Sequence, residues 1–234
     1  MLKAHLGGKA PSPILSEWLQ GDPVNIDQLI GRVILVEVFQ VNCPGCFLNA
    51  LPLASRLYET YFDQGLTVIG IATAFEDFHI NNLRNLTLLL TENIVVGETK
   101  RALLQQGKLI SGRLPFSIPF PVAMDRLQKR QKTTNRNEVV DFINRHVTDF
   151  EERPKIIQQN IYQQIEHYFQ SLDYHAKTFE LYDLKGTPSY ILIDRKGLLR
   201  HCKFGSHYNL EQQVQIILTK VSVFKNRVNI LINI

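Results

Sequence analysis

Apolar and polar positions follow two patterns along the chain, continuous apolar runs and steps of three and four, and these predict where strands and helices lie. Residues 33–39, VILVEVF, form a near-continuous run of β-branched and aromatic side chains broken by one acid, which is typical of a strand buried on both faces. Residues 47–65 carry apolar side chains at steps of three and four, which predicts an amphipathic helix ending at Gly65. With a second buried strand at 66–73, the start of the chain reads as a strand–helix–strand unit.

The later patterned segments extend this unit into a mixed α/β arrangement. Residues 189–193 and 198–204 flank the short turn 194–197, which predicts an antiparallel hairpin. The other expected elements are a helix at 77–93, a short helix near 99–107, a strand at 120–124 and a closing amphipathic helix at 209–221. We therefore expect one domain over 1–234.

Residues 126–176 are predicted to be a helical insertion within that domain. Two apolar faces with helical spacing occur in this piece, and Pro154 suits the first turn of the second helix. The first face comprises Val139, Ile143, Val147 and Phe150; the second comprises Ile157, Ile161, Ile165, Tyr168 and Leu172. Two helices packed as a hairpin or against the sheet are expected. The basic stretch 126–136, which lacks aromatic residues, is interpreted as a solvated loop or helix face.

Composition and charge narrow the possible partners. The 26 basic and 22 acidic residues give a formal net charge of +4, a milder excess than in dedicated nucleic-acid binders, so no nucleic-acid partner is expected. No stretch approaches the roughly 20 apolar residues that span a bilayer, and the start lacks the apolar region of a secretory signal. We therefore expect no membrane association and a cytoplasmic location, where thiols are kept reduced. Three cysteines are a poor disulfide framework, which favours a metal-binding or catalytic role for the close pair.

That pair is Cys43 and Cys46, in VNCPGC at the junction of the first strand and its helix. Thiol exchange needs a thiolate, and a helix N-terminus can bring a cysteine pKa from ~8.5 into the range ~3.5–7.5. Cys43 would lie at that N-terminus. Cys46, one turn further in, could attack a mixed disulfide on Cys43, while Pro44 suits the first helical position. Redox exchange is the favoured interpretation. The alternatives are a zinc site, for which only Cys202 remains as a further thiol, or two incidental thiols.

Glu37 is the acid within the first strand. It shares a strand face with Val33, Leu35 and Phe39, so burial is expected to raise its pKa by desolvation. It could then accept a proton from Cys46 in the resolving step. The alternative is an edge-strand glutamate that reaches solvent. Cys202, in an expected strand, is interpreted as a packing or surface residue rather than a third redox centre.

Two motifs together resemble the thioredoxin superfamily, in particular its TlpA-like and redoxin-like branch. GRVILVEVFQVNCPGC resembles the strand that leads into the C-x-x-C motif, and GTPSYILIDRKG at 186–197 resembles the cis-proline loop and following hairpin. The resemblance implies a thioredoxin fold, a central mixed β-sheet flanked by helices, here with a helical insertion before the cis-proline loop. It implies that Pro188 is the cis-proline. It also implies that Pro44, Gly45, Thr187 and Pro188 bind substrate beside the catalytic Cys43, Cys46 and Glu37.

Two other activities occur on this fold. Peroxidases place a threonine before the reactive cysteine where this chain has Gln40, which disfavours them. A copper chaperone would need a distal histidine; His175, His201 and His207 are candidates, but lone surface histidines are the default interpretation.

The sequence thus predicts a thiol–disulfide oxidoreductase acting as a reductase on protein disulfides, together with a second thiol redox partner. No metal, flavin or nucleotide cofactor is implied, since no glycine-rich phosphate loop follows a strand. The alternative is a non-catalytic binding module that holds a partner through the insertion. The alternating tail VNILINI, 228–234, could add to a sheet edge or form a homodimer.

Overall fold

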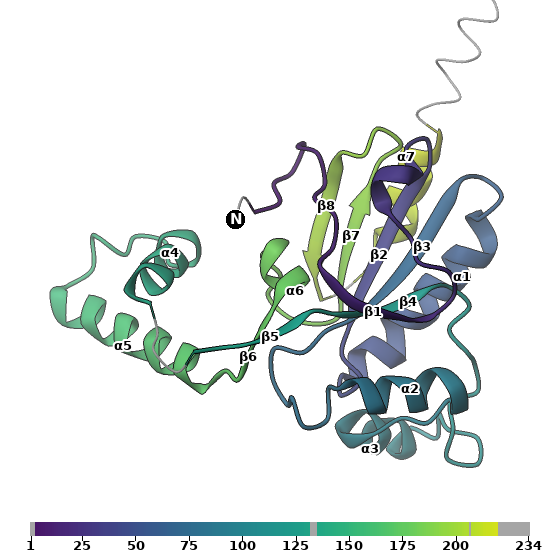
Figure 1. Ribbon diagram of the computed structural model, residues 1–234, viewed down its shortest axis with the longest axis horizontal. Coiled ribbons are helices and arrows are strands. Elements are labelled where there is room, and N and C mark those ends of the chain that lie inside the picture. The colour runs from purple at the N-terminus through teal and green to yellow at the C-terminus, as the bar shows by residue number, and fades with distance from the viewer. Residues whose placement is uncertain (1–2, 132–134, 206, 220–234) are drawn as a thin grey trace, which may run out of the picture. The chain divides into compact units, whose positions relative to one another are not determined.

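The structure is a computed structural model that describes residues 3–131, 135–205 and 207–219 (Figure 1). It contains two compact units. One is formed by Met1–Leu127 with Ala176–Ile234, and the other by Gln128–His175. The prediction of a single domain with an insertion at 126–176 stays a prediction, although the smaller unit begins and ends within two residues of that insertion. The tail 228–234 and its proposed dimer contact lie outside the described residues.

A six-stranded mixed sheet forms the larger unit. Its strand order is β1-β4-β3-β2-β7-β8, with β2–β3 and β3–β4 parallel and the other pairs antiparallel. The strands are β1 Leu15–Gln20, β2 Val33–Phe39, β3 Leu66–Ala72, β4 Val122–Asp125, β7 Ser189–Ile193 and β8 Leu199–Phe204. The predicted strands are confirmed, and β2 lies inside the sheet with every residue buried (Figure 1). This central position is what a near-continuous apolar run requires.

Helices cover the sheet on the side that holds the cysteine pair. They are α1 Leu51–Tyr61, α2 Leu83–Glu92, α3 Gly97–Gln105 and α7 Leu210–Thr219, which all contribute to one apolar cluster with Leu35, Phe39 and Val68. The opposite face of β2 packs against Leu181 and Tyr182, at the end of the short α6 Lys177–Leu181. A 3-10 turn, η1 Ile26–Leu29, precedes β2.

One predicted helix of the larger unit was wrong in extent, and one strand was missed. The expected helix 77–93 begins only at Leu83, because Asp77 takes a left-handed conformation and the Asn82 side chain accepts from the Asn85 N–H as an N-cap. Strand β1 was not predicted, since its side chains are only partly buried and its pairing with β4 is irregular. The closing helix, expected to reach residue 221, is described as far as Thr219.

The smaller unit is a helical hairpin, one of the two arrangements expected for this piece. It contains α4 Arg136–His146 and α5 Lys155–Ser171, together with most of the unpredicted short strands β5 Leu127–Lys129 and β6 Tyr174–Ala176, which pair with each other. Val139 and Ile143 pack against Phe169 in its core. The predicted second apolar face was wrong in part. Tyr168 is 46% exposed and Ile157 is 40% exposed, because α5 turns Phe169 inward instead.

Within the basic stretch 126–136, Arg126, Lys129 and Arg136 are exposed, as expected, and Arg130 is the exception. The Arg130 side chain is only 6% exposed and donates to both carboxylate oxygens of Glu138 at 2.8 Å. Its guanidinium lies 5.1 Å from the centre of the Phe169 ring, and its Nη1 lies 3.0 Å from His175 Nδ1. His175 is therefore not a lone surface histidine. A buried arginine needs such partners, so Arg130 is part of the unit's core.

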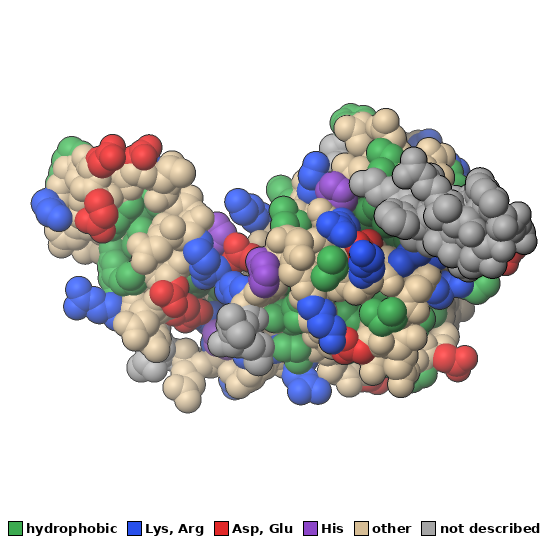
Figure 2. Space-filling model, turned by 90° about the horizontal axis from the view of Figure 1, so that it is seen from above, with side chains coloured by type: hydrophobic (Ala, Val, Ile, Leu, Met, Phe, Trp, Pro, Cys, Tyr) green, Lys and Arg blue, Asp and Glu red, His purple; other side chains and the backbone are tan. Residues whose placement is uncertain are grey.

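Charges elsewhere are mixed. On the face in Figure 2, Lys and Arg side chains are interspersed with Asp and Glu side chains, in keeping with the small net charge. No helix within the described ranges is both long and apolar enough to cross a membrane.

Candidate active site

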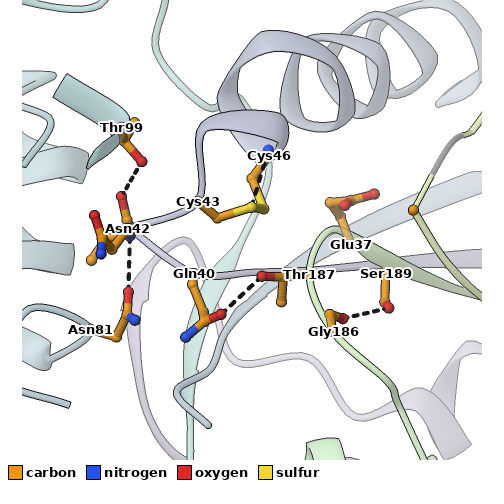
Figure 3. The surroundings of a disulfide bond; sticks show 12 residues. Glu37, Gln40, Asn42, Cys43, Cys46, Asn81, Thr99, Gly186, Thr187 and Ser189 are labelled. Carbon is orange, nitrogen blue, oxygen red and sulfur yellow. Dashed lines mark hydrogen bonds between the residues drawn. A yellow bond between two sulfur atoms is a disulfide. The ribbon is translucent and has the colours of Figure 1, made fainter. Parts of the chain in front are cut away.

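Cys43 and Cys46 form a disulfide directly after β2, with their Cα atoms 5.4 Å apart (Figure 3). The chain turns at residues 41–42 and enters helical conformation at Pro44, so Cys43 stands at the helix N-terminus as the sequence predicts. In the described part of the chain, the third cysteine, Cys202, is a free thiol.

The two sulfurs occupy different environments. Cys43 is 8% exposed, whereas Cys46 is fully buried. The Cys46 N–H lies 3.3 Å from Cys43 Sγ and donates to the Cys43 carbonyl oxygen at 3.0 Å. Cys43 thus has the better access and the amide donor that favours a thiolate.

Cys46 begins a π-helical turn, Cys46–Ala50, that leads into α1. The Leu51 N–H, rather than the N–H one residue earlier, donates to the Cys46 carbonyl oxygen. Pro52, which has no N–H to donate, follows in the first turn of α1. The sequence predicts a regular α-helix here. The structure has a wider π-helical turn instead, in which the Leu51 N–H is the donor to the Cys46 carbonyl oxygen.

The loop before Cys43 is fixed by contacts that the sequence analysis missed. The Asn42 backbone N–H donates to Asn81 Oδ1 at 2.9 Å, and Asn42 Oδ1 accepts from the Glu98 N–H at 2.7 Å. The Thr99 hydroxyl donates to the Val41 carbonyl oxygen at 2.8 Å. Figure 3 shows Asn42 flanked by Asn81 and Thr99. These residues lie 39 to 58 positions along the chain from the groups they contact, so no local pattern marks them.

Glu37 is fully buried in the central strand, which overturns the alternative of an edge-strand glutamate. Burial raises the pKa of its carboxyl group, and the nearby His207 ring opposes that shift. His207 Nε2 lies 3.1 and 3.3 Å from the two carboxyl oxygens. The buried carboxyl group of Glu37 can therefore exchange a proton with the His207 ring, without contact with solvent.

His207 is the main functional candidate that sequence reasoning misjudged. We expected a lone surface histidine, but the side chain is buried in the loop between β8 and α7. Its Nδ1 lies 2.6 Å from the Gly205 carbonyl oxygen, and its ring meets the Tyr190 ring edge-on at 4.8 Å between centroids. Tyr190 in turn faces Glu37 across the β2–β7 pair. A contact spanning 170 positions leaves no signal in the local sequence.

The second motif lies against the first. The Thr187–Pro188 peptide bond is cis, as the resemblance implies. A Cβ atom built on Gly45 would lie 3.7 Å from Pro188 Cδ, so Gly45 and Pro188 face each other. The Thr187 hydroxyl donates to Gln40 Oε1 at 3.0 Å, which ties this loop to the end of β2 (Figure 3). The roles predicted for Pro44, Gly45, Thr187 and Pro188 in substrate binding stay predictions.

The remaining candidates do not join the site as a metal centre. Among the described residues, no group of three or more His, Cys, Asp or Glu side chains is arranged to hold a metal ion. Cys202 packs against the cluster on the other face of the sheet, and burial raises its pKa to about 11. The pKa of His201 is lowered by partial burial and by Lys203 and Arg200.

The chain is similar to known proteins in both sequence and structure. No protein-family model matches the chain. Protein FixW of Rhizobium leguminosarum is 27% identical over 127 residues, which cover 52% of this chain and 57% of FixW, so the match spans little more than half of that relative. A thiol–disulfide isomerase from Corynebacterium glutamicum superposes with a TM-score of 0.56 at 22% identity, covering 92% of this chain and 97% of that one. A thioredoxin-like superfamily protein gives 0.52 at 22% identity, covering 91% and 97%. The chain has a thioredoxin fold.

Proposed function

We propose that the protein is a thiol–disulfide oxidoreductase whose Cys43–Cys46 pair exchanges two electrons with a disulfide of a protein substrate. The observation that carries this proposal is the disulfide at a helix N-terminus, in which Cys43 is 8% exposed and Cys46 is fully buried. A buried carboxyl group and a cis-proline loop beside the pair support it.

In the reducing direction, the Cys43 thiolate attacks one sulfur of the substrate disulfide, and the other substrate sulfur leaves as a thiolate. Glu37 takes the proton of the Cys46 thiol, and the Cys46 sulfur attacks Cys43 Sγ. The Cys43–substrate bond breaks, the second substrate sulfur leaves with that electron pair, and the Cys43–Cys46 disulfide forms. A second thiol redox partner then returns two electrons to the pair.

The substrate chain would bind along Thr187–Pro188 and over Pro44 and Gly45. The close approach of Gly45 to Pro188 supports this location, because substrate seated on the cis-proline loop would also meet the cysteine pair. Exposed apolar side chains on the helical unit, including Ile156 at 64% exposure, support a role for residues 126–176 in choosing partners.

The first test is the reduction potential of the Cys43–Cys46 pair, measured by equilibration in glutathione or dithiothreitol buffers with Cys46→Ser as the control. A value near ~−270 mV or below supports the reductase direction and fits the predicted cytoplasmic location. A value of ~−120 to −180 mV assigns the opposite direction, that of an oxidant or isomerase. If no disulfide forms at any potential, the enzyme proposal fails and the binding module remains.

A further inference from the structure

Both ring nitrogens of His207 face an oxygen, and the two oxygens impose different requirements. A backbone carbonyl oxygen can only accept a hydrogen bond, so the Nδ1 that lies 2.6 Å from Gly205 O must carry a hydrogen. The carboxyl group of Glu37 can either donate or accept. At 3.1 Å, Nε2 and Glu37 Oε2 therefore hold a proton between them in either of two arrangements. The first is a neutral acid beside a neutral imidazole; the second is a carboxylate beside an imidazolium.

We propose that Glu37 and His207 form a carboxyl–imidazole pair sharing one proton, in which His207 is the positioning residue that keeps Glu37 able to accept the Cys46 proton. This inference rests on the proposed function. It adds a residue from the β8–α7 loop to a site otherwise built from the two motifs. The imidazole acts only through Glu37.

Among the described residues around the Glu37 carboxyl group, His207 is the one that is placed to share its proton. On β3 the residue opposite Glu37 is Gly70, which has no side chain. On β7 it is Tyr190, whose hydroxyl donates to Gln213 of α7 at 2.7 Å. Lys203 follows on β8 in the same register but is exposed. The nearest acid of α7, Glu211, is bonded to Arg56 of α1.

The pair changes what Glu37 can do in the resolving step. When His207 holds the shared proton, Glu37 is a carboxylate and takes the Cys46 proton as that sulfur attacks Cys43. The pair then holds two protons and releases one to solvent after the substrate sulfur has left as a thiolate. Without the imidazole, the buried carboxylate has no adjacent positive charge, and the neutral acid, which cannot accept a proton, is favoured.

The test uses the reduced full-length protein and one equivalent of 5,5′-dithiobis(2-nitrobenzoate). The first thionitrobenzoate released reports the attack by Cys43, and the second reports resolution by Cys46. In His207→Gln and His207→Ala we expect an unchanged first phase. The second should be several times slower near pH 7, because loss of the imidazole favours the neutral acid, and should recover at higher pH. His201→Gln is the matched control and should match the wild type in both phases.

The outcomes separate the two proposals. If the wild type releases no second equivalent, the proposed function fails. If the wild type releases both and the His207 variants keep its second-phase rates from pH 5 to 9, the pair is refuted. Adding His207→Gln to Glu37→Gln should slow nothing further, and an additive effect would also refute it. Should the variants not fold, ¹⁵N spectra of the wild type decide. Nδ1 must stay protonated in neutral His207, and an unprotonated Nδ1 overturns the assignment.

Discussion

Replacing Glu37 with Gln should change how the stability of the protein depends on pH. The substitution keeps the size of the side chain and a group that can hydrogen-bond to His207 Nε2, but removes the ionisable proton. Folding raises the pKa of Glu37 above its ordinary value of 4.5, chiefly by desolvation. The stability that this group contributes is therefore fully present below pH 4.5 and is lost as the pH rises through the folded pKa.

The size of the effect follows from counting protons. Above pH 4.5 the unfolded wild type has lost the Glu37 proton, whereas the folded pair still holds one proton more than the folded variant. Linkage then lowers the wild-type free energy of unfolding, relative to Glu37→Gln, by about 1.4 kcal/mol for each pH unit. The difference becomes constant above the folded pKa. Relative to its value at pH 4.5, the difference should therefore have moved in favour of the variant at neutral pH.

Urea unfolding of both proteins between pH 4.5 and 8.5, with the cysteine pair oxidised throughout, measures this difference. Glu59→Gln makes the same chemical change at an exposed position of α1 and should follow the wild type across the range. A difference between the wild type and Glu37→Gln that does not vary with pH would show that Glu37 ionises in the fold as it does in water, which the buried geometry forbids.

Three further substitutions test other parts of the site and of the helical unit. Gly97→Ala places a Cβ 2.3 Å from Asn42 Oδ1 at a φ of +55°, so it should lower the free energy of unfolding by about 1–3 kcal/mol, and an unchanged urea midpoint would contradict the packing. Arg130→Met removes two bonds to Glu138 and should cost about 1.5–3 kcal/mol, seen as faster proteolysis within 128–175; wild-type resistance would show that this ion pair is dispensable. Cys46→Ser, mixed with an oxidised protein substrate, should accumulate a mixed disulfide on Cys43 by mass spectrometry. Equal trapping by Cys43→Ser would contradict the assignment of Cys43 as the attacking sulfur.

The sheet could be predicted where a strand is buried on both faces. In β2 and β3 nearly every side chain enters the core, so consecutive residues are apolar and the strand is visible in the sequence. In β1 only part of each side chain is covered and the pairing is irregular, so its composition resembles a loop. The prediction of the apolar face of α5 was wrong in part for a related reason. Tyr168 and Phe169 are both aromatic, and only the packing against Val139 and Ile143 decides which of them turns inward.

The positions of the cysteine pair and of Glu37 could be predicted because they depend on neighbours in sequence. A strand places Glu37, and the strand–helix junction places Cys43. The anchors of the Asn42 loop depend on contacts between distant segments, and neither Asn81 nor Thr99 belongs to a recognisable motif.

His207 shows how far the argument from sequence could have gone. A carboxyl group predicted to be buried in a central strand carries a desolvation penalty, and that penalty already implies a partner capable of holding a proton or a positive charge. Physical chemistry therefore predicts that a partner exists, but its identity depends on which loop the fold brings to β2. The chain contains seven histidines, and only the folded loop between β8 and α7 distinguishes His207 from the other six. A buried acid in a predicted central strand is thus a reason to search the distant loops for its partner before treating their histidines as surface residues.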